Sequence, residues 1–192
     1  MKLLKFFSIL FLLIIFLPNK SFAEMPEISA GKTHFDIFKG YYVLEDNVNV
    51  VMKNHGVTAT ITANSAKVNV MTQKCWANGK VTLTHDDINF SCDKAYLQWK
   101  TSTAEVVGNV NFKNKKNISV TSDTAVFSWK DKTIDFYGKV KLNAEKTVQF
   151  AEGLKLKNKI YAHVQYDVKE NKILKLEEKT TDPEIVIPEP DE

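Results

Sequence analysis

The sequence contains no arginine and only two cysteines, and it has few residues that break secondary structure, with 7 glycines and 5 prolines among 192 residues. The absence of arginine argues against nucleic-acid binding, because the planar guanidinium is the side chain best suited to phosphate and guanine. The 26 basic residues, all of them lysine, are nearly balanced by 23 acidic residues, so the chain lacks a strongly basic footprint. The cysteines, Cys75 and Cys92, have a spacing that matches no metal or redox motif.

The first 23 residues have the pattern of a secretory signal. Lys2 and Lys5 precede an apolar run at 6–17, and residues 21–23 (Ser-Phe-Ala) place small residues where a signal peptidase cleaves. This run has 12 residues, whereas a helix needs about 20 to span a bilayer. We therefore expect residues 1–23 to be cleaved and the mature protein to reside in the periplasm. An uncleaved N-terminal anchor is the alternative.

The mature chain divides into a domain at 24–179 and a tail at 180–192. The tail is acidic and proline-rich, so we expect it to be disordered. Because an exported chain meets an oxidising environment, Cys75 and Cys92 are expected either to form a disulfide or to remain as two buried free thiols.

A short motif recurs at intervals near 30 residues. It consists of Gly or Asp, a polar residue, Val, any residue and an apolar residue, and it occurs at 46–50, 79–83, 108–112 and 138–142. A second motif, Ala-x-apolar, begins at Ala66, Ala95 and Ala125, in each case 15 residues before the next valine. This repetition predicts about four stacked hairpin units. The glycines predict a bend or bulge where the chain turns from one strand into the next.

Apolar and polar residues alternate with period two between these motifs, as at 88–92, 95–99 and 125–129. Such alternation predicts strands with one apolar and one polar face, and no segment has a convincing helical stripe. We expect an incomplete first unit before Asp46, a fourth full unit through 140–156, and a closing hairpin at 160–176. A stack of this kind ends in open strand edges, expected near 33–38 and 173–176.

The recurring motifs resemble those of the OstA/LptA-like family of periplasmic lipopolysaccharide-transport proteins and the related N-terminal domains of the outer-membrane translocon. The similarity covers roughly 33–156, although this chain lacks arginine and has Asp46 in place of the first glycine. The resemblance implies an all-β jellyroll of two facing antiparallel sheets, open at both ends, whose interior holds the acyl chains of lipid A. It also implies head-to-tail self-association and partnership with other bridge components at the inner and outer membranes.

The expected lipid groove is formed by side chains at inward positions of the strands. They are Val68, Leu83, Phe90, Leu97, Trp99, Val110, Phe112, Phe127, Trp129, Phe136, Leu142 and Phe150. The four histidines are scattered and no cluster has catalytic or metal-ligand spacing, so we expect neither an enzyme nor a cofactor. The leading hypothesis is binding and transport of lipopolysaccharide. The alternative is a structural or adhesive β-solenoid with a filled core and no lipid ligand.

Overall fold

The computed structural model describes residues 27–54, 57–85, 87–115, 118–179 and 185–190. The expected signal segment lies outside these residues. Throughout the described part the regular structure is β, and no helix there is long and apolar enough to cross a membrane. The strands are β1 (Glu27–Ser29), β2 (Lys32–Asp36), β3 (Tyr41–Asn54), β4 (Val57–Asn69), β5 (Lys74–His85), β6 (Ile88–Gln98), β7 (Thr103–Asn114), β8 (Ile118–Ser128), β9 (Thr133–Ala144), β10 (Gln149–Phe150), β11 (Tyr161–Asp167) and β12 (Lys172–Glu177).

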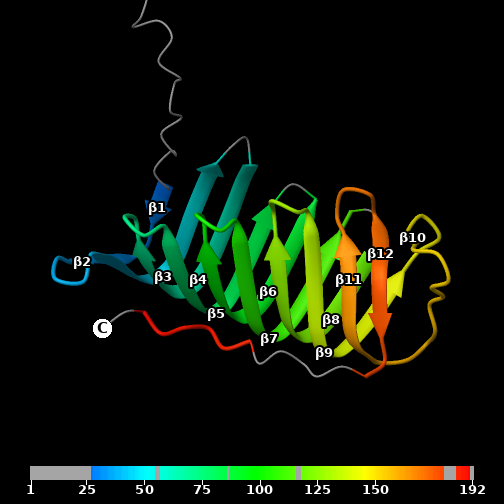
Figure 1. Ribbon diagram of the computed structural model, residues 1–192. Helices are drawn as coiled ribbons and strands as arrows, with labels where there is room; N and C mark the ends of the chain where they lie inside the picture. Colours follow the sequence, from blue (N-terminus) through cyan, green and yellow to red (C-terminus); the bar gives the residue numbers. More distant parts are fainter. Residues whose placement is uncertain (1–26, 55–56, 86, 116–117, 180–184, 191–192) are drawn as a thin grey trace, which may run out of the picture.

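Hydrogen bonds join all twelve strands into a single open sheet. Its order is β1-β3-β4-β5-β6-β7-β8-β9-β11-β12-β10, and β2 pairs with β3 beside β1. From β3 to β9 the strands are antiparallel and adjacent in sequence, which is the stack of hairpins that the repeat predicts (Figure 1). The all-β jellyroll fold is thereby confirmed.

Each long strand bends near its middle, where the pairing register shifts. The bend folds the sheet into a trough, with the bends at the bottom of Figure 1 and the turns at the top. We call the two sides of the trough half A and half B. Half A contains β11, β12 and the strand segments 41–45, 65–69, 74–78, 94–98, 103–107, 124–128 and 133–137. Half B contains the segments 48–54, 57–62, 81–85, 88–91, 110–114, 118–121 and 140–144. The two facing sheets that we expected are therefore the two halves of one continuous sheet.

The glycines of the repeat mark these bends. Gly108 has φ +81° and the next residue, Asn109, has φ +48°, so two consecutive residues are left-handed in the middle of β7. We expected the glycine to lie between two strands, and this detail is wrong, because Gly108 interrupts one strand that continues on both sides. The extra residues form a bulge, which sharpens the local bend without ending the pairing.

The bend also explains how both halves bury their apolar residues inside the trough. In β6, Ile88 and Phe90 are buried before the bend, and Ala95 and Leu97 are buried after it. The step from even to odd positions occurs at the bend, between Cys92 and Ala95, where the pairing register of β6 with both β5 and β7 shifts. The same core cluster therefore receives side chains from both halves.

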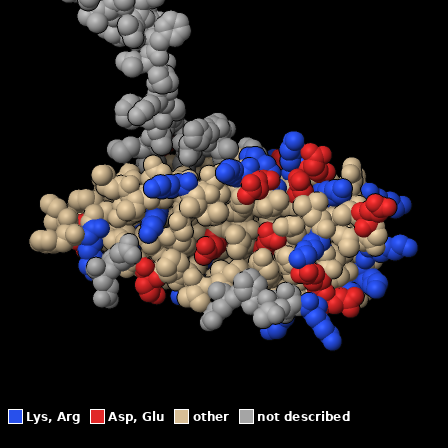
Figure 2. All heavy atoms as spheres, viewed as in Figure 1, with Lys and Arg blue, Asp and Glu red and all other residues tan. Residues whose placement is uncertain are grey.

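The two ends of the stack carry the open edges. At one end, β2 pairs with β3 alone among the described strands, and the hairpin there exposes Phe35 (46%), Ile37 (75%) and Phe38 (98%). In Figure 2 the tip of this hairpin is mainly tan, the colour of residues other than Lys, Arg, Asp and Glu. At the other end, β11 and β12 form the expected closing hairpin, and β12 is covered by β10 only at residues 172–173.

The expected fourth full unit is incomplete. Between β9 and β11 the only strand is β10, which has two residues. β10 and the residue after it lie along the edge of β12, because the amides of Gln149 and Ala151 donate to the carbonyls of Asn171 and Ile173. The segment thus covers part of an open edge instead of repeating the hairpin.

The described part of the tail contacts the sheet. Residues 185–190, expected to be disordered, lie in an extended conformation across the outer face of half A, and the segment runs along the sheet toward β3 in Figure 1. The indole of Trp76 donates a hydrogen bond to the carbonyl of Pro188 at 2.7 Å. Contact with an aromatic surface orders this part of the tail.

Candidate functional site

Aromatic rings from the two halves meet in the middle of the trough. Phe90 and Phe112, on half B, are cross-strand neighbours whose ring centroids lie 5.0 Å apart. Phe127 and Phe136, on half A, face them, with centroid distances of 6.3 Å from Phe90 to Phe127 and 5.4 Å from Phe112 to Phe136. Tilted rings at these distances interact favourably beyond the burial of their surface. The interior is therefore an aromatic-centred apolar space between two sheet halves.

All twelve side chains predicted to line the groove belong to this space. Eight are almost completely buried, with exposures of 0–4%: Val68, Leu83, Phe90, Leu97, Val110, Phe112, Phe127 and Phe136. The other four are partly buried and pack against the cluster from its margins: Trp99, Trp129, Leu142 and Phe150. The sequence alternation thus identified members of one continuous apolar surface.

The two tryptophans lie at equivalent places in successive turns of half A. The amide of Trp99 donates to the carbonyl of Gln73, and the amide of Trp129 donates to the carbonyl of Ser102. Each turn is thereby tied to the preceding turn along the stack. Both indoles are partly buried against the core cluster, and the turns that carry them form the rim of the trough in Figure 1.

Sequence reasoning missed the residues that close the C-terminal part of the interior. Tyr166 is fully buried, and its ring lies 5.9 Å from that of Phe112 on the opposite half. Its hydroxyl accepts a hydrogen bond from Asn114 at 2.6 Å and donates one to Asn171 at 2.8 Å, and burial raises its pKa to about 12. The bond to Asn114 joins half A to half B near their rims. The alternation of apolar residues at 162, 164, 166 and 168 with polar residues is the sequence signal that could have identified Tyr166.

Cys75 and Cys92, for which the sequence allowed a disulfide, are free thiols in the structure. Both are buried in the core cluster, and the thiol of Cys92 donates to the carbonyl of Lys94 at 3.3 Å. Desolvation raises the pKa of each thiol to about 12. Such thiols are poor nucleophiles at neutral pH, because the thiolate is the reactive form.

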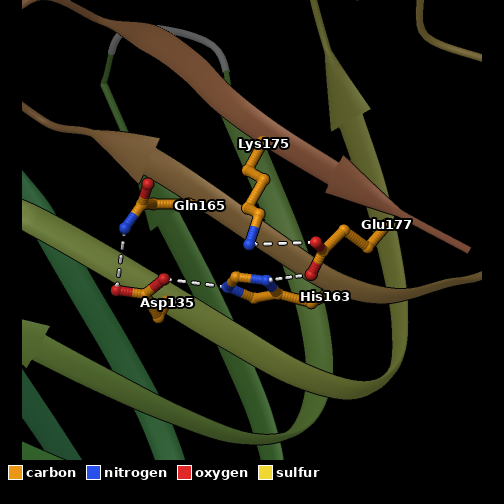
Figure 3. Close-up of polar contacts among 5 residues, drawn as sticks. All are labelled: Asp135, His163, Gln165, Lys175 and Glu177. Carbon is orange, nitrogen blue, oxygen red and sulfur yellow. Dashed lines mark hydrogen bonds and ion pairs between the residues drawn. The ribbon is translucent and has the colours of Figure 1, made fainter. Parts of the chain in front are cut away.

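A polar cluster lies outside the trough, on the outer face of half A (Figure 3). Both ring nitrogens of His163 are 2.8 Å from carboxylate oxygens, with Nε2 facing Asp135 and Nδ1 facing Glu177. Lys175 pairs with Glu177 at 2.9 Å, and the imidazole stacks on Tyr137 with a centroid distance of 4.5 Å. Two ionised carboxylates can both accept hydrogen bonds from the ring only when both nitrogens carry a proton, so this arrangement favours the imidazolium form. These interactions connect the strands β9, β11 and β12.

The electrostatics of His163 agree with this geometry. Burial alone would lower its pKa, but the hydrogen bonds and charges of Asp135 and Glu177 outweigh burial and raise the pKa above its ordinary value. Hydrogen bonds from Lys175 and His163 lower the pKa of Glu177. Among the described residues, no group of three or more His, Cys, Asp and Glu side chains could hold a metal ion.

Comparison with known proteins locates this fold and its repeats in one family. The family model of "OstA-like protein" matches residues 45–181, which is more than half of the chain. The chain belongs to the OstA-like family. The match begins near the bend of β3 and includes β4 to β9 and the closing hairpin of β11 and β12. The interior of this OstA-like protein therefore lies almost entirely within the matched residues.

The OstA-like protein is also similar to solved structures. One is the crystal structure of LptH, the LptA-homologous periplasmic component of the conserved lipopolysaccharide transport device from Pseudomonas aeruginosa. It is 11% identical, with a TM-score of 0.48, and the match covers 70% of this chain and 91% of that chain. The search of curated proteins found no match.

Proposed function

We propose that this protein binds the acyl chains of lipopolysaccharide in its trough and passes the lipid along the periplasm toward the outer membrane. The continuous apolar surface shared by the two halves carries this proposal, because acyl chains need an apolar lining and the lipid headgroup needs an open side. Membership of the OstA-like family supports it. The proposed role is transport without catalysis and without a cofactor.

The open ends of the sheet support the second part of the proposal, the bridge between membranes. An edge strand presents unpaired backbone groups to which another strand can be added. Copies of this protein, and related components at the inner and outer membranes, would join at β2 and at β12. A trough that continues from one copy to the next would give the lipid an apolar path.

One observation favours the alternative function, a structural solenoid with a filled core. Phe90 contacts Phe127 and Phe136 across the trough, and all three rings are almost fully buried. In a lipid carrier, acyl chains must displace these contacts as the halves move apart. In a solenoid the same contacts would persist.

A photo-crosslinking pair distinguishes the two functions in cells. A photoreactive amino acid at position 127 faces the interior, whereas one at position 126, the next residue on the same strand, faces outward. Lipid transport predicts that position 127 labels lipopolysaccharide and position 126 does not. Equal labelling from both positions, or labelling from neither, would leave the filled solenoid as the better description.

A second experiment uses purified protein. Leu97→Glu places a carboxylate in the apolar lining, and an unpaired buried charge is costly, so lipid uptake should be abolished. Val126→Glu, on the outer face, is the matched control and should retain uptake. A Leu97→Glu protein that binds lipopolysaccharide as well as the unmodified chain would contradict the proposed binding site.

A further inference from the structure

Three aromatic side chains form a cluster on the outer face of half A, where solvent-facing residues are expected. Trp76 contacts Tyr41 with a centroid distance of 5.6 Å and Tyr96 with a distance of 5.1 Å. All three are buried, with exposures of 3–8%. This cluster is separate from the interior of the trough, because Trp76 and Tyr96 are cross-strand partners that point away from it.

The cluster is buried because the C-terminal tail lies over it. Ile187 packs against the three rings, and the Trp76 indole donates to the carbonyl of Pro188 at 2.7 Å. The neighbouring side chain, Val186, is 65% exposed, so the tail presents alternate faces to the sheet and to solvent. Aromatic grooves with a donor to the backbone are a recurring means of binding extended, proline-containing peptides.

Lysines outnumber acidic side chains on the surface beside Glu189 of the tail. Lys67 and Lys94 line the space beside Ile187 to Pro190 together with Glu45, and Lys39 lines the adjoining space around Glu189 together with Asp36. The tail after Thr181 carries five acidic residues and no basic residue. Electrostatic attraction of this kind favours encounter and orientation of an acidic segment.

The tail leaves part of this surface unfilled. A groove of about 310 Å³ remains between the tail and the strands β3 to β6, lined by Val43, Lys67 and Trp76 among others. The surface is therefore larger than the segment that covers it.

We propose that the outer face of β3 to β6 is a peptide-binding groove whose ligand is this chain's own C-terminal tail. Docked in the same molecule, the tail closes the groove to other acidic, proline-containing segments. The direction of the chain supports docking within one molecule, because Ile187 lies at Trp76 while Pro190 is farther on, beside Tyr41 and Asp36. The tail thus continues away from β12, in which the domain ends. This inference does not depend on lipid binding.

Release of the tail tests the proposal directly. Ile187→Asp removes the side chain that packs on the aromatic cluster, whereas Val186→Asp makes the same chemical change on the solvent side of the tail. The probe is a fluorescently labelled synthetic peptide of residues 181–192, titrated into each full-length protein and followed by anisotropy. The peptide should bind the Ile187→Asp protein at least roughly tenfold more tightly than the unmodified or Val186→Asp protein, because an occupied site lowers apparent affinity.

Two further measurements test the role of the Trp76 indole, one by substitution and one in the unmodified protein. Trp76→Phe in the Ile187→Asp background removes the indole donor and should weaken peptide binding. In the unmodified protein, the indole proton of Trp76 should exchange slowly with solvent, because it is bonded to Pro188. Equal peptide binding to all proteins, no peptide binding to the Ile187→Asp protein, or rapid exchange of that proton would each overturn the proposal.

Discussion

Gly108 lies so close to the side chain of Asp93 that a Cβ atom at position 108 would be 2.4 Å from Oδ2 and 2.9 Å from Cβ of the aspartate. With φ +81°, position 108 also has a backbone conformation that disfavours any other residue. We expect Gly108→Ala to lower the free energy of unfolding by about 2–4 kcal/mol, from left-handed strain and overpacking together. Urea unfolding followed by circular dichroism measures this change.

Gly153 is the matched control, because it has φ +79° but no neighbouring atom within 4 Å of an added Cβ. Gly153→Ala should therefore show the backbone cost alone, about 1 kcal/mol. Asp93→Gly should recover part of the loss in the Gly108→Ala protein by making room. If both substitutions lower the free energy of unfolding equally, the contact with Asp93 does not contribute to the cost at position 108.

His163 should make the stability of the closing hairpin dependent on pH. Its pKa is raised in the folded state by Asp135 and Glu177, so its stabilisation is fully present below the ordinary value of 6.5. That stabilisation is lost as the pH rises through the raised pKa of the folded state. The free energy of unfolding, measured in urea at a series of pH values, should therefore fall as the pH rises from 6.5 to the raised pKa of His163.

Substitution separates this contribution from other titrating groups. His163→Gln should remove the fall, whereas His34→Gln, at an exposed position on β2, should leave it unchanged. The protection factors of the amides in β11 and β12, which are corrected for the intrinsic rise of exchange with pH, should fall at high pH in the unmodified protein, because the cluster joins these strands to β9. A pH profile that His163→Gln leaves unaltered would contradict the assignment.

The two cysteines should be inert while the protein is folded. Because burial raises the pKa of both thiols to about 12, iodoacetamide at neutral pH should modify neither Cys75 nor Cys92 in the native state. After unfolding without reductant, mass spectrometry should find both alkylated. If neither is alkylated until a reductant is added, the two residues are bridged in the isolated protein.

Self-association should depend on the apolar hairpin at the β2 edge. Phe38 is 98% exposed, and Phe38→Asp should weaken end-to-end association without altering the unfolding midpoint. Met71 is 90% exposed in the turn between β4 and β5, two strands that are paired on both sides, so Met71→Asp is the control. Sedimentation velocity should show that the mass of the unmodified protein rises with concentration. A strictly monomeric protein would argue against the bridge, although not against lipid binding by one copy.

Much of the interior could be predicted because strand geometry is local. Residues such as Phe90, Leu97 and Phe127 follow a strict period of two, and this places them on the buried face whichever strands are neighbours. The repeat then indicated which strands pair. Tyr166 escaped prediction because it lies beyond the last repeat motif, at 138–142, and its bond to Asn114 spans 52 residues of sequence.

The sequence by itself determined the strands, their stacking and the apolar face, since backbone sterics and side-chain alternation act between near neighbours. Tertiary structure alone decided three further features: that Gly108 bends one strand instead of ending it, that His163 lies between Asp135 and Glu177, and that the tail covers Trp76. Each depends on a contact between segments distant in the chain. Such contacts follow from the fold of the whole sheet, and no local pattern of residues encodes them.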